Sequence, residues 1–315
     1  MVTDKLYDLI IVGGGPAGLA AGLYAGRAMM DCLILEGQGP GGQVMMTHEI
    51  ENYPGFIDPI SGGNLSANMY SQTLRFGVEF VSQPVRELKI NDKIKTVRTS
   101  EGAFQAKAVI IATGVTPRLL SVPGEAEYTG RGVSYCATCD GAFFRDKTVA
   151  VVGGGDTAVK EALFLTKFAK KVYLIHRRDQ LRAEPVQRQR LLASPKIEPI
   201  WNTVVGKVHG DGNRVTGLSL NSQQGGRPPQ ALHVDGVFVF VGRQPMGPME
   251  GTGLIVDTDG YIKTDEDMQT NLPGVYAVGD VRSKRWRQIV TAVSDGCIAA
   301  LSAAEYIEEN FREED

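Results

Sequence analysis

The sequence predicts an α/β protein with two Rossmann-like dinucleotide-binding domains, because one pattern occurs twice along the chain. An apolar strand, a glycine-rich turn, a helix and a second apolar strand follow one another from Leu6 and again from Thr148. In such units the glycines let the backbone approach a pyrophosphate, and the helix N-terminus favours its negative charge. A pair of cysteines, Cys136 and Cys139, stands between the two units, with Asp140 directly behind it.

The first unit starts with a strand over Leu6–Val12, followed by the turn and a helix over Leu19–Met29. The second strand, Cys32–Leu35, ends in Glu36, which stands 23 positions after Gly13. A carboxylate at this distance holds ribose hydroxyls and indicates a dinucleotide site more strongly than the glycines alone. A glycine-rich turn without a ligand is the alternative. The turn residues expected to contact the cofactor are Gly13, Gly15, Pro16, Ala17 and Gly18.

Two loops add further expected contacts in the first half of the chain. Gly41, Gly42 and Gln43 form a glycine-rich loop with one amide side chain, and Asn52 lies in the next loop. Loops of this composition lie close to ligands, but they also occur as plain surface turns.

The chain is expected to cross between two domains at two places. The strand that ends at Ile111 leads to Thr113 and Gly114, whose small size lets the backbone pass close to a cofactor. Thr116-Pro117 then breaks the strand pattern, and Gly242–Pro248 breaks it again later in the chain.

Cys136 and Cys139 fit a redox pair, because two thiols at this spacing can close and reopen a short disulfide. Asp140 can supply or remove the proton that each step needs. A Cys-x-x-Cys is also half of a zinc site, but the other two cysteines are lone and distant, and no histidine lies near the pair. We therefore expect redox chemistry and no metal; a structural or metal-binding pair is the alternative.

The second unit repeats the order of the first. A strand over Thr148–Val152 leads into the turn and a helix that the pattern extends to Lys170. The next strand, Val172–Ile175, ends at His176, again 23 positions after the first glycine of the turn. The turn residues expected to contact the cofactor are Gly153, Gly155, Asp156 and Thr157.

One difference between the units changes the expected ligand. Where the first unit has Glu36, the second has His176, followed by Arg177, Arg178 and Arg182. An acid would repel a 2′-phosphate, whereas guanidinium groups bind it in bidentate fashion, so this site should select NADP over NAD. A surface basic cluster is the alternative. The two units thus predict two ligands, one without a 2′-phosphate, such as FAD, and NADPH.

The rest of the second unit is expected to contain short strands and one polar loop, over residues 221–230. The last segment carries an apolar strand that ends in Gly279 and Asp280, which can aim a carboxylate at a polyol such as a flavin ribityl chain. A closing amphipathic helix is expected over Gly296–Asn310, with its first amides facing the flavin ring. An acidic turn and a core helix are the alternative.

The composition is that of a soluble globular protein, since 43% of the 315 residues are hydrophobic and 22% are charged. A net charge of −3 gives no electrostatic footprint for nucleic acid or for an anionic membrane. The sequence shows neither a secretory signal nor an apolar run long enough to span a bilayer. Because there are also only four cysteines, we expect a cytoplasmic protein with no nucleic-acid or membrane partner.

Taken together, the residues resemble one family nearly from end to end, the low-molecular-weight, bacterial-type NADPH-dependent thioredoxin reductases. The motifs that carry the resemblance are Gly13–Gly18, Gly41–Gln43, Cys136–Asp140, Gly153–Asp156, His176–Arg178 with Arg182, and Gly279-Asp280 followed by Arg287-Gln288. The resemblance implies a homodimer and the pyridine nucleotide-disulfide oxidoreductase architecture. An FAD-binding domain in two parts, 1–116 and 244–315, would flank an inserted NADPH-binding domain, 117–243, that carries the cysteine pair.

The resemblance also implies roles for single residues. Arg177, Arg178 and Arg182 are expected to hold the 2′-phosphate of NADPH. Contacts to FAD are implied for Glu36, Gln43, Asn52, Asp280, Arg287, Gln288 and Ile289.

The implied reaction passes electrons from NADPH to FAD, then to the cysteine disulfide, and then to thioredoxin or a thioredoxin-like protein. Cys139 is expected to meet the flavin, Asp140 to move the proton, and Cys136 to attack the disulfide of the protein substrate. Dithiol and nicotinamide must each meet the same flavin ring. The family's rotation of one domain on the other is therefore expected, hinged near Thr116-Pro117 and Gly242–Gln244.

Three places depart from the family's pattern. Thr157 stands where Ser is usual, Arg243-Gln244-Pro245-Met246 replaces the commoner His-x-Pro-Asn, and Trp286 stands where Tyr is frequent. They concern the hinge and the flavin environment more than the reaction. The alternative functions are a disulfide reductase of the same fold fed by a donor such as ferredoxin, and a flavin-binding redox sensor. A ferredoxin-NADP reductase of this fold lacks the cysteine pair.

Overall fold

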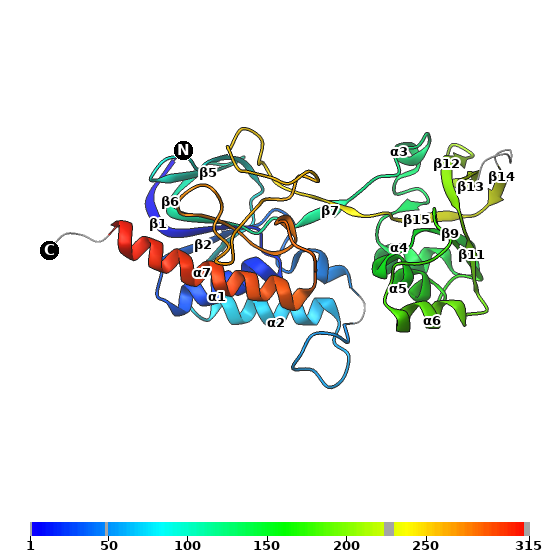
Figure 1. The fold of residues 1–315 in the computed structure, drawn as a ribbon, viewed down its shortest axis with the longest axis horizontal. Helices are drawn as coiled ribbons and strands as arrows, with labels where there is room; N and C mark the ends of the chain where they lie inside the picture. Colours follow the sequence, from blue (N-terminus) through cyan, green and yellow to red (C-terminus); the bar gives the residue numbers. More distant parts are fainter. Residues whose placement is uncertain (1, 48–49, 224–229, 312–315) are drawn as a thin grey trace. The chain divides into compact units, whose positions relative to one another are not determined.

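The structure, a computed structural model, describes residues 2–47, 50–223 and 230–311. The chain divides into two compact units, each visible in Figure 1. The split unit consists of residues 1–116 and 244–315, and the inserted unit consists of residues 117–243. Where the chain passes between them, β7 (Val115–Pro117) pairs with β16 (Arg243–Pro245) in a two-stranded sheet. The division falls at the expected crossings; which cofactor each unit binds stays a prediction.

The split unit is built on a seven-stranded sheet in the order β3-β2-β1-β6-β5-β4, with β17 also paired to β6. The pairings among β1, β2, β3, β6 and β17 are parallel, whereas β4, β5 and β6 form an antiparallel meander. The strands are β1 (Val2–Val12), β2 (Cys32–Leu35), β3 (Glu79–Val81), β4 (Val85–Lys89), β5 (Lys95–Thr99), β6 (Ala103–Ile111) and β17 (Val275–Ala277).

The sheet of the split unit is buried on both faces. Leu9 and Ile11 of β1 belong to the core that contains α1 (Pro16–Arg27) and α7 (Ile289–Phe311), and α2 (Gly62–Leu74) packs beside α1. Ile10 and Val12 point the other way, into a second core that includes Ile262. Burial on both faces explains why Leu9–Val12 of this strand is a continuous apolar run rather than an alternating one.

The last helix begins earlier than the sequence predicts. α7 starts at Ile289, whereas a start at Gly296 was expected. The glycine looked like a helix boundary, but it lies inside the helix because α1 passes close by, and a Cβ at Gly296 would lie 2.2 Å from the carbonyl oxygen of Ala17. Among the described residues α7 alone is long and apolar enough to cross a membrane. It is a core helix of the split unit, since buried Asp295 and a row of buried alanines pack in it.

The inserted unit has three layers. Its middle layer is a parallel five-stranded sheet in the order β11-β10-β9-β15-β8. One face packs against α5 and the other against the antiparallel sheet β12-β13-β14. The elements are β8 (Val133–Ser134), β9 (Thr148–Gly153), β10 (Lys171–Ile175), β11 (Ile197–Ile200), β12 (Thr203–Gly210), β13 (Val215–Ser222), β14 (Gln230–His233), β15 (Gly236–Phe240), α3 (Glu125–Tyr128), α4 (Ala137–Asp140), α5 (Asp156–Leu165) and α6 (Pro185–Leu192).

In the inserted unit, one helix is shorter than the sequence predicts, and one predicted loop is only partly described. The helix after the second glycine-rich turn ends at Leu165, not at Lys170. Thr166 is its C-cap and donates its hydroxyl to the carbonyl of Leu163 at 2.6 Å. The N–H of Lys170 donates to the carbonyl of Lys147, outside the helix. Of the expected polar loop, residues 224–229 lie outside the described residues.

Candidate functional site

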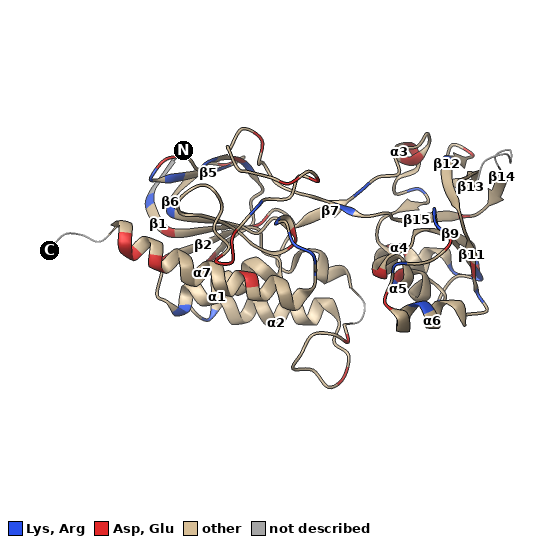
Figure 2. Cartoon of the chain, viewed as in Figure 1, with Lys and Arg blue, Asp and Glu red and all other residues tan. Residues whose placement is uncertain are grey.

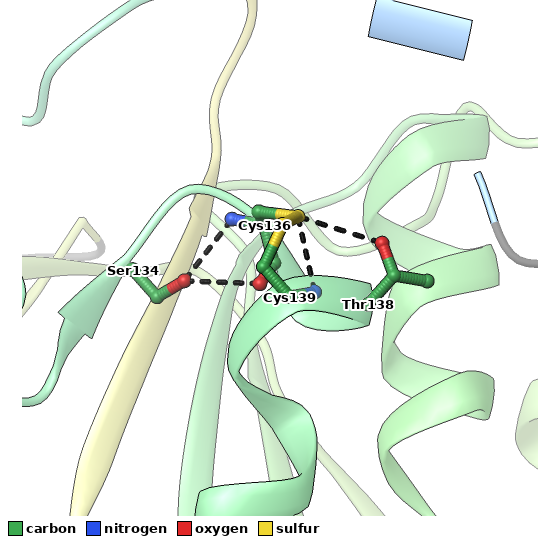
Figure 3. Close-up of a disulfide and its surroundings, with 4 residues drawn as sticks. All are labelled: Ser134, Cys136, Thr138 and Cys139. Atoms are coloured by element: carbon green, nitrogen blue, oxygen red, sulfur yellow. Dashed lines mark hydrogen bonds between the residues drawn. A yellow bond between two sulfur atoms is a disulfide. The ribbon is translucent and has the colours of Figure 1, made fainter. Parts of the chain in front are cut away.

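Cys136 and Cys139 form a disulfide, with their Cα atoms 5.4 Å apart (Figure 3). The pair lies just after β8: Cys136 is the N-cap of α4, and Cys139 stands within that short helix. The backbone N–H of Cys139 donates to Sγ of Cys136 at 3.2 Å. Cys139 is exposed and Cys136 is half-buried. A disulfide that exchanges with a partner must be accessible, and this one is.

Hydrogen bonds hold the backbone of Cys136 in place. The hydroxyl of Ser134 accepts from the N–H of Cys136 at 3.0 Å and donates to its carbonyl at 3.1 Å. Thr138 Oγ1 lies 3.4 Å from Sγ of Cys136 (Figure 3). The N–H of Asp140 donates to the carbonyl of Cys136 at 3.2 Å. All three predicted catalytic residues therefore lie within one helical turn.

The first glycine-rich turn leaves a space that suits a pyrophosphate. At Gly13, where φ is +113°, a Cβ would lie 2.4 Å from the carbonyl oxygen of Ala112, and at Gly18 it would lie 1.9 Å from that of Gly13. At Gly15, the N-cap of α1, a Cβ would meet no heavy atom within 4 Å. The outer glycines serve close packing, whereas the middle one opens a space at a helix N-terminus, followed by Pro16 at its first position.

Glu36, which the sequence predicts to hold ribose hydroxyls, lies against this turn. Its Oε2 accepts from the N–H of Gly14 at 2.6 Å, and its Oε1 accepts from the N–H of Gln38 at 2.8 Å. The N–H of Gly41 donates to the carbonyl of Gly14 at 2.7 Å. A Cβ on Gly42, which opens the 3₁₀ helix η1 (Gly42–Met46), would lie 3.2 Å from Cα of Gly15. The predicted loop thus packs directly on the predicted turn.

Other predicted contacts to FAD meet one another in pairs. Asn52 Nδ2 donates to Oε1 of Gln288 at 3.1 Å, although 236 positions separate the two residues. Arg287 Nε lies 3.4 Å from the carbonyl oxygen of Asp280, and its guanidinium stacks 3.9 Å from the ring centroid of Tyr261. The first pair joins the two parts of the split unit, whereas the contacts of Arg287 lie within residues 244–315.

The remaining predicted residues lie nearby or at the crossings. Gly279 begins the 3₁₀ helix η3 (Gly279–Val281), and a Cβ on it would lie 2.9 Å from Cβ of Ala17. Thr113 donates its hydroxyl to the carbonyl of Met246, and Gln43 donates its amide to the carbonyl of Val115. Gly114 accepts from the N–H of Met246 at 3.0 Å, and Ile289 is the first residue of α7.

Sequence reasoning missed Asp295, which supports the turn at Gly279. Its buried carboxylate accepts from the N–H of Gly279 at 2.9 Å. It also pairs with Arg282 at 3.1 Å and with Lys284 at 2.8 Å. No sequence motif marks it, since it is one of several polar residues on this helix.

The second glycine-rich turn is arranged like the first, with a different side chain on it. The ring of His176 packs on Gly154, where a Cβ would lie 2.2 Å from Cε1 of the imidazole. Among the described residues, Nε2 of this histidine has no hydrogen-bond partner. Burial lowers the pKa of His176, a hydrogen bond to the backbone of Gln180 opposes the shift, and the neighbouring arginines lower the pKa further. The imidazole is therefore neutral at pH 7. At Gly155 a Cβ would meet no heavy atom within 4 Å, so this turn also leaves room for a pyrophosphate.

The arginine-rich loop after β10 is attached to this turn. The N–H of Arg182 donates to the carbonyl of Gly154 at 2.7 Å. Asp156, predicted to contact the cofactor, accepts from the N–H of Glu184 at 2.7 Å through Oδ1. The bonds fix the loop beside the position expected for the adenosine half of NADPH.

A pocket of about 390 Å³ lies in this loop. Arg178 and Arg182, which the sequence predicts to hold the 2′-phosphate, line it together with Asp179. Arg188, which the sequence did not single out, lines it from α6, where Figure 2 shows basic residues. Arg177 is outside this lining.

A buried acid on α5 of the inserted unit was also missed. Glu161 stands on α5, and its Oε2 is buried with no hydrogen-bond partner in the described part of the chain. Burial raises the pKa of Glu161 to about 7, and the charges of Arg243 and Lys160 act against the shift.

Comparison with known proteins extends these observations to the whole chain. The pyridine nucleotide-disulphide oxidoreductase family model matches residues 7–296. A thioredoxin reductase of Peptoclostridium litorale is 47% identical over 98% of this chain and 100% of its own length. One of Listeria monocytogenes is 48% identical over 97% of this chain and 95% of its own.

A solved structure agrees with the relatives. The thioredoxin reductase of Lactococcus lactis matches with a TM-score of 0.93 and 43% identity, covering 96% of this chain and 99% of that one. The match to the family model spans both glycine-rich turns and the two cysteines. The chain therefore belongs to the thioredoxin reductases of the pyridine nucleotide-disulphide oxidoreductase family.

Proposed function

We propose that the protein reduces the disulfide of thioredoxin or a thioredoxin-like protein, using NADPH as donor, FAD as relay and the Cys136–Cys139 disulfide as the last internal carrier. The observation that carries the proposal is the accessible disulfide within a unit that also holds a glycine-rich turn and an arginine-lined pocket. A homodimer, which the sequence resemblance implies, and a cytoplasmic location, which the composition and the few cysteines favour, are part of the proposal.

The residues that would hold FAD are those gathered around the first turn. The open space at Gly15 suits the pyrophosphate, and Glu36 suits a ribose. Asp280, Arg287 and the start of α7 would contact the rest of the cofactor. When bound there, FAD supplies a carrier that takes two electrons from NADPH and gives them to the disulfide.

The residues that would hold NADPH are those of the second turn and the arginine-rich loop. The space at Gly155 suits its pyrophosphate, and Arg178 and Arg182 suit its 2′-phosphate. A ferredoxin-fed reductase would have no use for such a pocket, and this favours NADPH as the donor.

The cysteines carry out the thiol chemistry. Two electrons and two protons convert the Cys136–Cys139 disulfide into two thiols, and Asp140 holds the proton that moves to and from Cys139. The thiolate of Cys136 attacks one sulfur of the partner's disulfide, and the other partner sulfur leaves as a thiol. Cys139 then attacks Cys136, which releases the reduced partner and restores the disulfide.

The proposal is tested by anaerobic titration of the purified yellow protein with NADPH, followed through the flavin absorbance. About two equivalents per flavin are expected, because flavin and disulfide each accept two electrons. About one equivalent would leave the disulfide outside the electron path. An unbleached flavin would show that NADPH is not the donor.

A matched pair of variants makes the titration sharper. Cys139→Ser should need about one equivalent of NADPH and lose turnover with thioredoxin. Cys297→Ser, which changes a cysteine outside the disulfide, should need two and keep turnover. Full turnover in Cys139→Ser would refute the roles given to the cysteines.

A further inference from the structure

We propose that Arg188 is the third arginine of the 2′-phosphate pocket and contributes to the selection of NADPH over NADH. This inference rests on the proposed function, and it adds a residue that lies outside the arginine-rich loop. Arg188 belongs to α6, and it shares the pocket with Arg178 and Arg182 of the loop.

The pocket has the charge that a 2′-phosphate requires. Three arginines and one acidic residue, Asp179, line it, which leaves an excess of positive charge. A phosphate monoester carries close to two negative charges at neutral pH. Arginine also offers paired N–H groups that match two phosphate oxygens, so a third arginine adds hydrogen bonds as well as charge.

Arg188 differs from the two loop arginines in how it is held. Arg178 and Arg182 are exposed residues of an irregular segment, whereas Arg188 is half-buried and stands on a helix. Its backbone N–H donates to the carbonyl of Glu184 at 3.0 Å. Glu184 in turn donates its own N–H to Asp156, the first residue of α5. Through this chain of bonds the backbone of Arg188 is positioned relative to the second glycine-rich turn. Because Arg188 is also half-buried, its side chain has less freedom to lose on binding a phosphate than an exposed arginine has.

The test compares two small ligands on the full-length protein loaded with FAD. 2′,5′-ADP carries the 2′-phosphate, and 5′-AMP lacks it, so the difference in their affinities reports the pocket alone. Isothermal titration calorimetry gives both dissociation constants without any turnover. Arg188→Gln should bind 2′,5′-ADP about tenfold more weakly and bind 5′-AMP as the wild type does.

Two further variants serve as controls. Arg190→Gln changes the same residue type on the same helix, outside the pocket lining, and should leave both affinities unchanged. Arg188→Lys keeps the charge without the paired N–H groups, so its affinity for 2′,5′-ADP should lie between those of the wild type and Arg188→Gln. The melting temperature and the flavin content show that each variant is folded.

The possible failures can be told apart. If the wild type prefers 2′,5′-ADP and both Arg188 variants bind it as tightly as the wild type, the inference is wrong while the proposed use of NADPH stands. If the wild type binds 2′,5′-ADP no better than 5′-AMP, the pocket is not a 2′-phosphate site, and the inference and the NADPH proposal both fail.

Discussion

Glu161 shows how one buried residue can link the stability of the inserted unit to pH. Its folded-state pKa of about 7 lies above the ordinary value of 4.5, because burial disfavours the charged form. The folded protein therefore keeps this proton at pH values where the unfolded chain has released it. The contribution of this group to the free energy of unfolding is fully present below about pH 4.5. It decreases as the pH rises towards 7 and changes little above that.

We expect Glu161→Gln to stabilise the protein at high pH, since glutamine has no charge to bury. At pH 8 the gain should be at most about 3 kcal/mol, and it should vanish near pH 4.5. The measurement is the melting temperature of both proteins between pH 4.5 and 8.5. Glu184→Gln, at an exposed position, is the control and should show no such trend. A difference that is constant with pH would contradict the assignment.

Two glycines of the second turn should respond in opposite ways to alanine. A Cβ at Gly155 meets no protein atom within 4 Å, and φ there is −94°, so Gly155→Ala should fold normally. Its methyl group would occupy the space proposed for the pyrophosphate, and we expect NADP⁺ to bind about tenfold more weakly or worse. At Gly153, with φ +151° and a Cβ 2.4 Å from the carbonyl oxygen of Phe240, alanine should lower the melting temperature instead.

Calorimetry with NADP⁺ and thermal unfolding separate the two effects. If Gly155→Ala lost stability and kept its affinity, the open space at this turn would have no role in binding.

At the scale of the residue, the sequence motifs predicted only those candidate site residues that lie within the motifs. Glu36 and the arginines of the loop were found because a fixed spacing from a glycine-rich turn marks them. Asp295 was missed because it stands on a helix, at a position that only the folding of the chain brings to Gly279. Arg188 was missed because no motif marks it, although it follows Arg182 by only six positions. The residues on either side of Asp295 and Arg188 in the sequence are typical of helices and indicate no binding site.

At the scale of the element, α7 carries the ion cluster that holds the turn at Gly279. The side chains of Asp295, Arg282 and Lys284 are 8%, 14% and 10% exposed. Removing the carboxylate would leave two cations and one backbone N–H without their buried partner. We expect Asp295→Ala to lower the free energy of unfolding by about 3–5 kcal/mol and to speed the loss of FAD.

The control for Asp295→Ala is Glu87→Ala, which breaks an exposed pair with Arg98 and should change stability by less than about 1 kcal/mol. Thermal unfolding and flavin release into the filtrate are the two measurements. Wild-type stability in Asp295→Ala would mean that solvent replaces the carboxylate and that the cluster supports neither the helix nor the turn.

The elements were predictable where hydrophobic runs and glycines gave the same answer. The strands β2, β9 and β10 are largely apolar runs between turn signals, and the structure has them within one residue of the expected bounds, whereas β1 begins four residues before the expected Leu6. Helix ends were less predictable. Gly296 was interpreted as the start of the last helix. Its actual role is to let α1 approach closely, and this role depends on a residue almost three hundred positions away in the sequence.

At the scale of the whole molecule, each unit has its own cores. Two hydrophobic cores lie wholly within the split unit, and two lie wholly within the inserted unit. We expect residues 117–243, expressed alone, to fold, to form the Cys136–Cys139 disulfide and to bind 2′,5′-ADP within about threefold of the full-length affinity. Circular dichroism, thiol counting and calorimetry check the three points. An unfolded spectrum would mean that the inserted unit depends on contacts with the rest of the chain.

The fold class was predictable at this scale because the strand–turn–helix–strand pattern occurs twice in the sequence. That the two crossings pair as strands was not predictable. Each of these two strands is only three residues long, and its composition does not distinguish a paired strand from an unpaired linker.

The pairing of β7 with β16 also bears on how such a chain can arise. An insertion enters and leaves its host at neighbouring residues here, so the gene for the inserted unit could be gained or replaced without disturbing the host's sheet. The same ribbon could accept another unit whose first and last strands pair in this way. A single flavin-binding host could thus have acquired new electron acceptors by recombination at one point, rather than by gradual remodelling of its own surface.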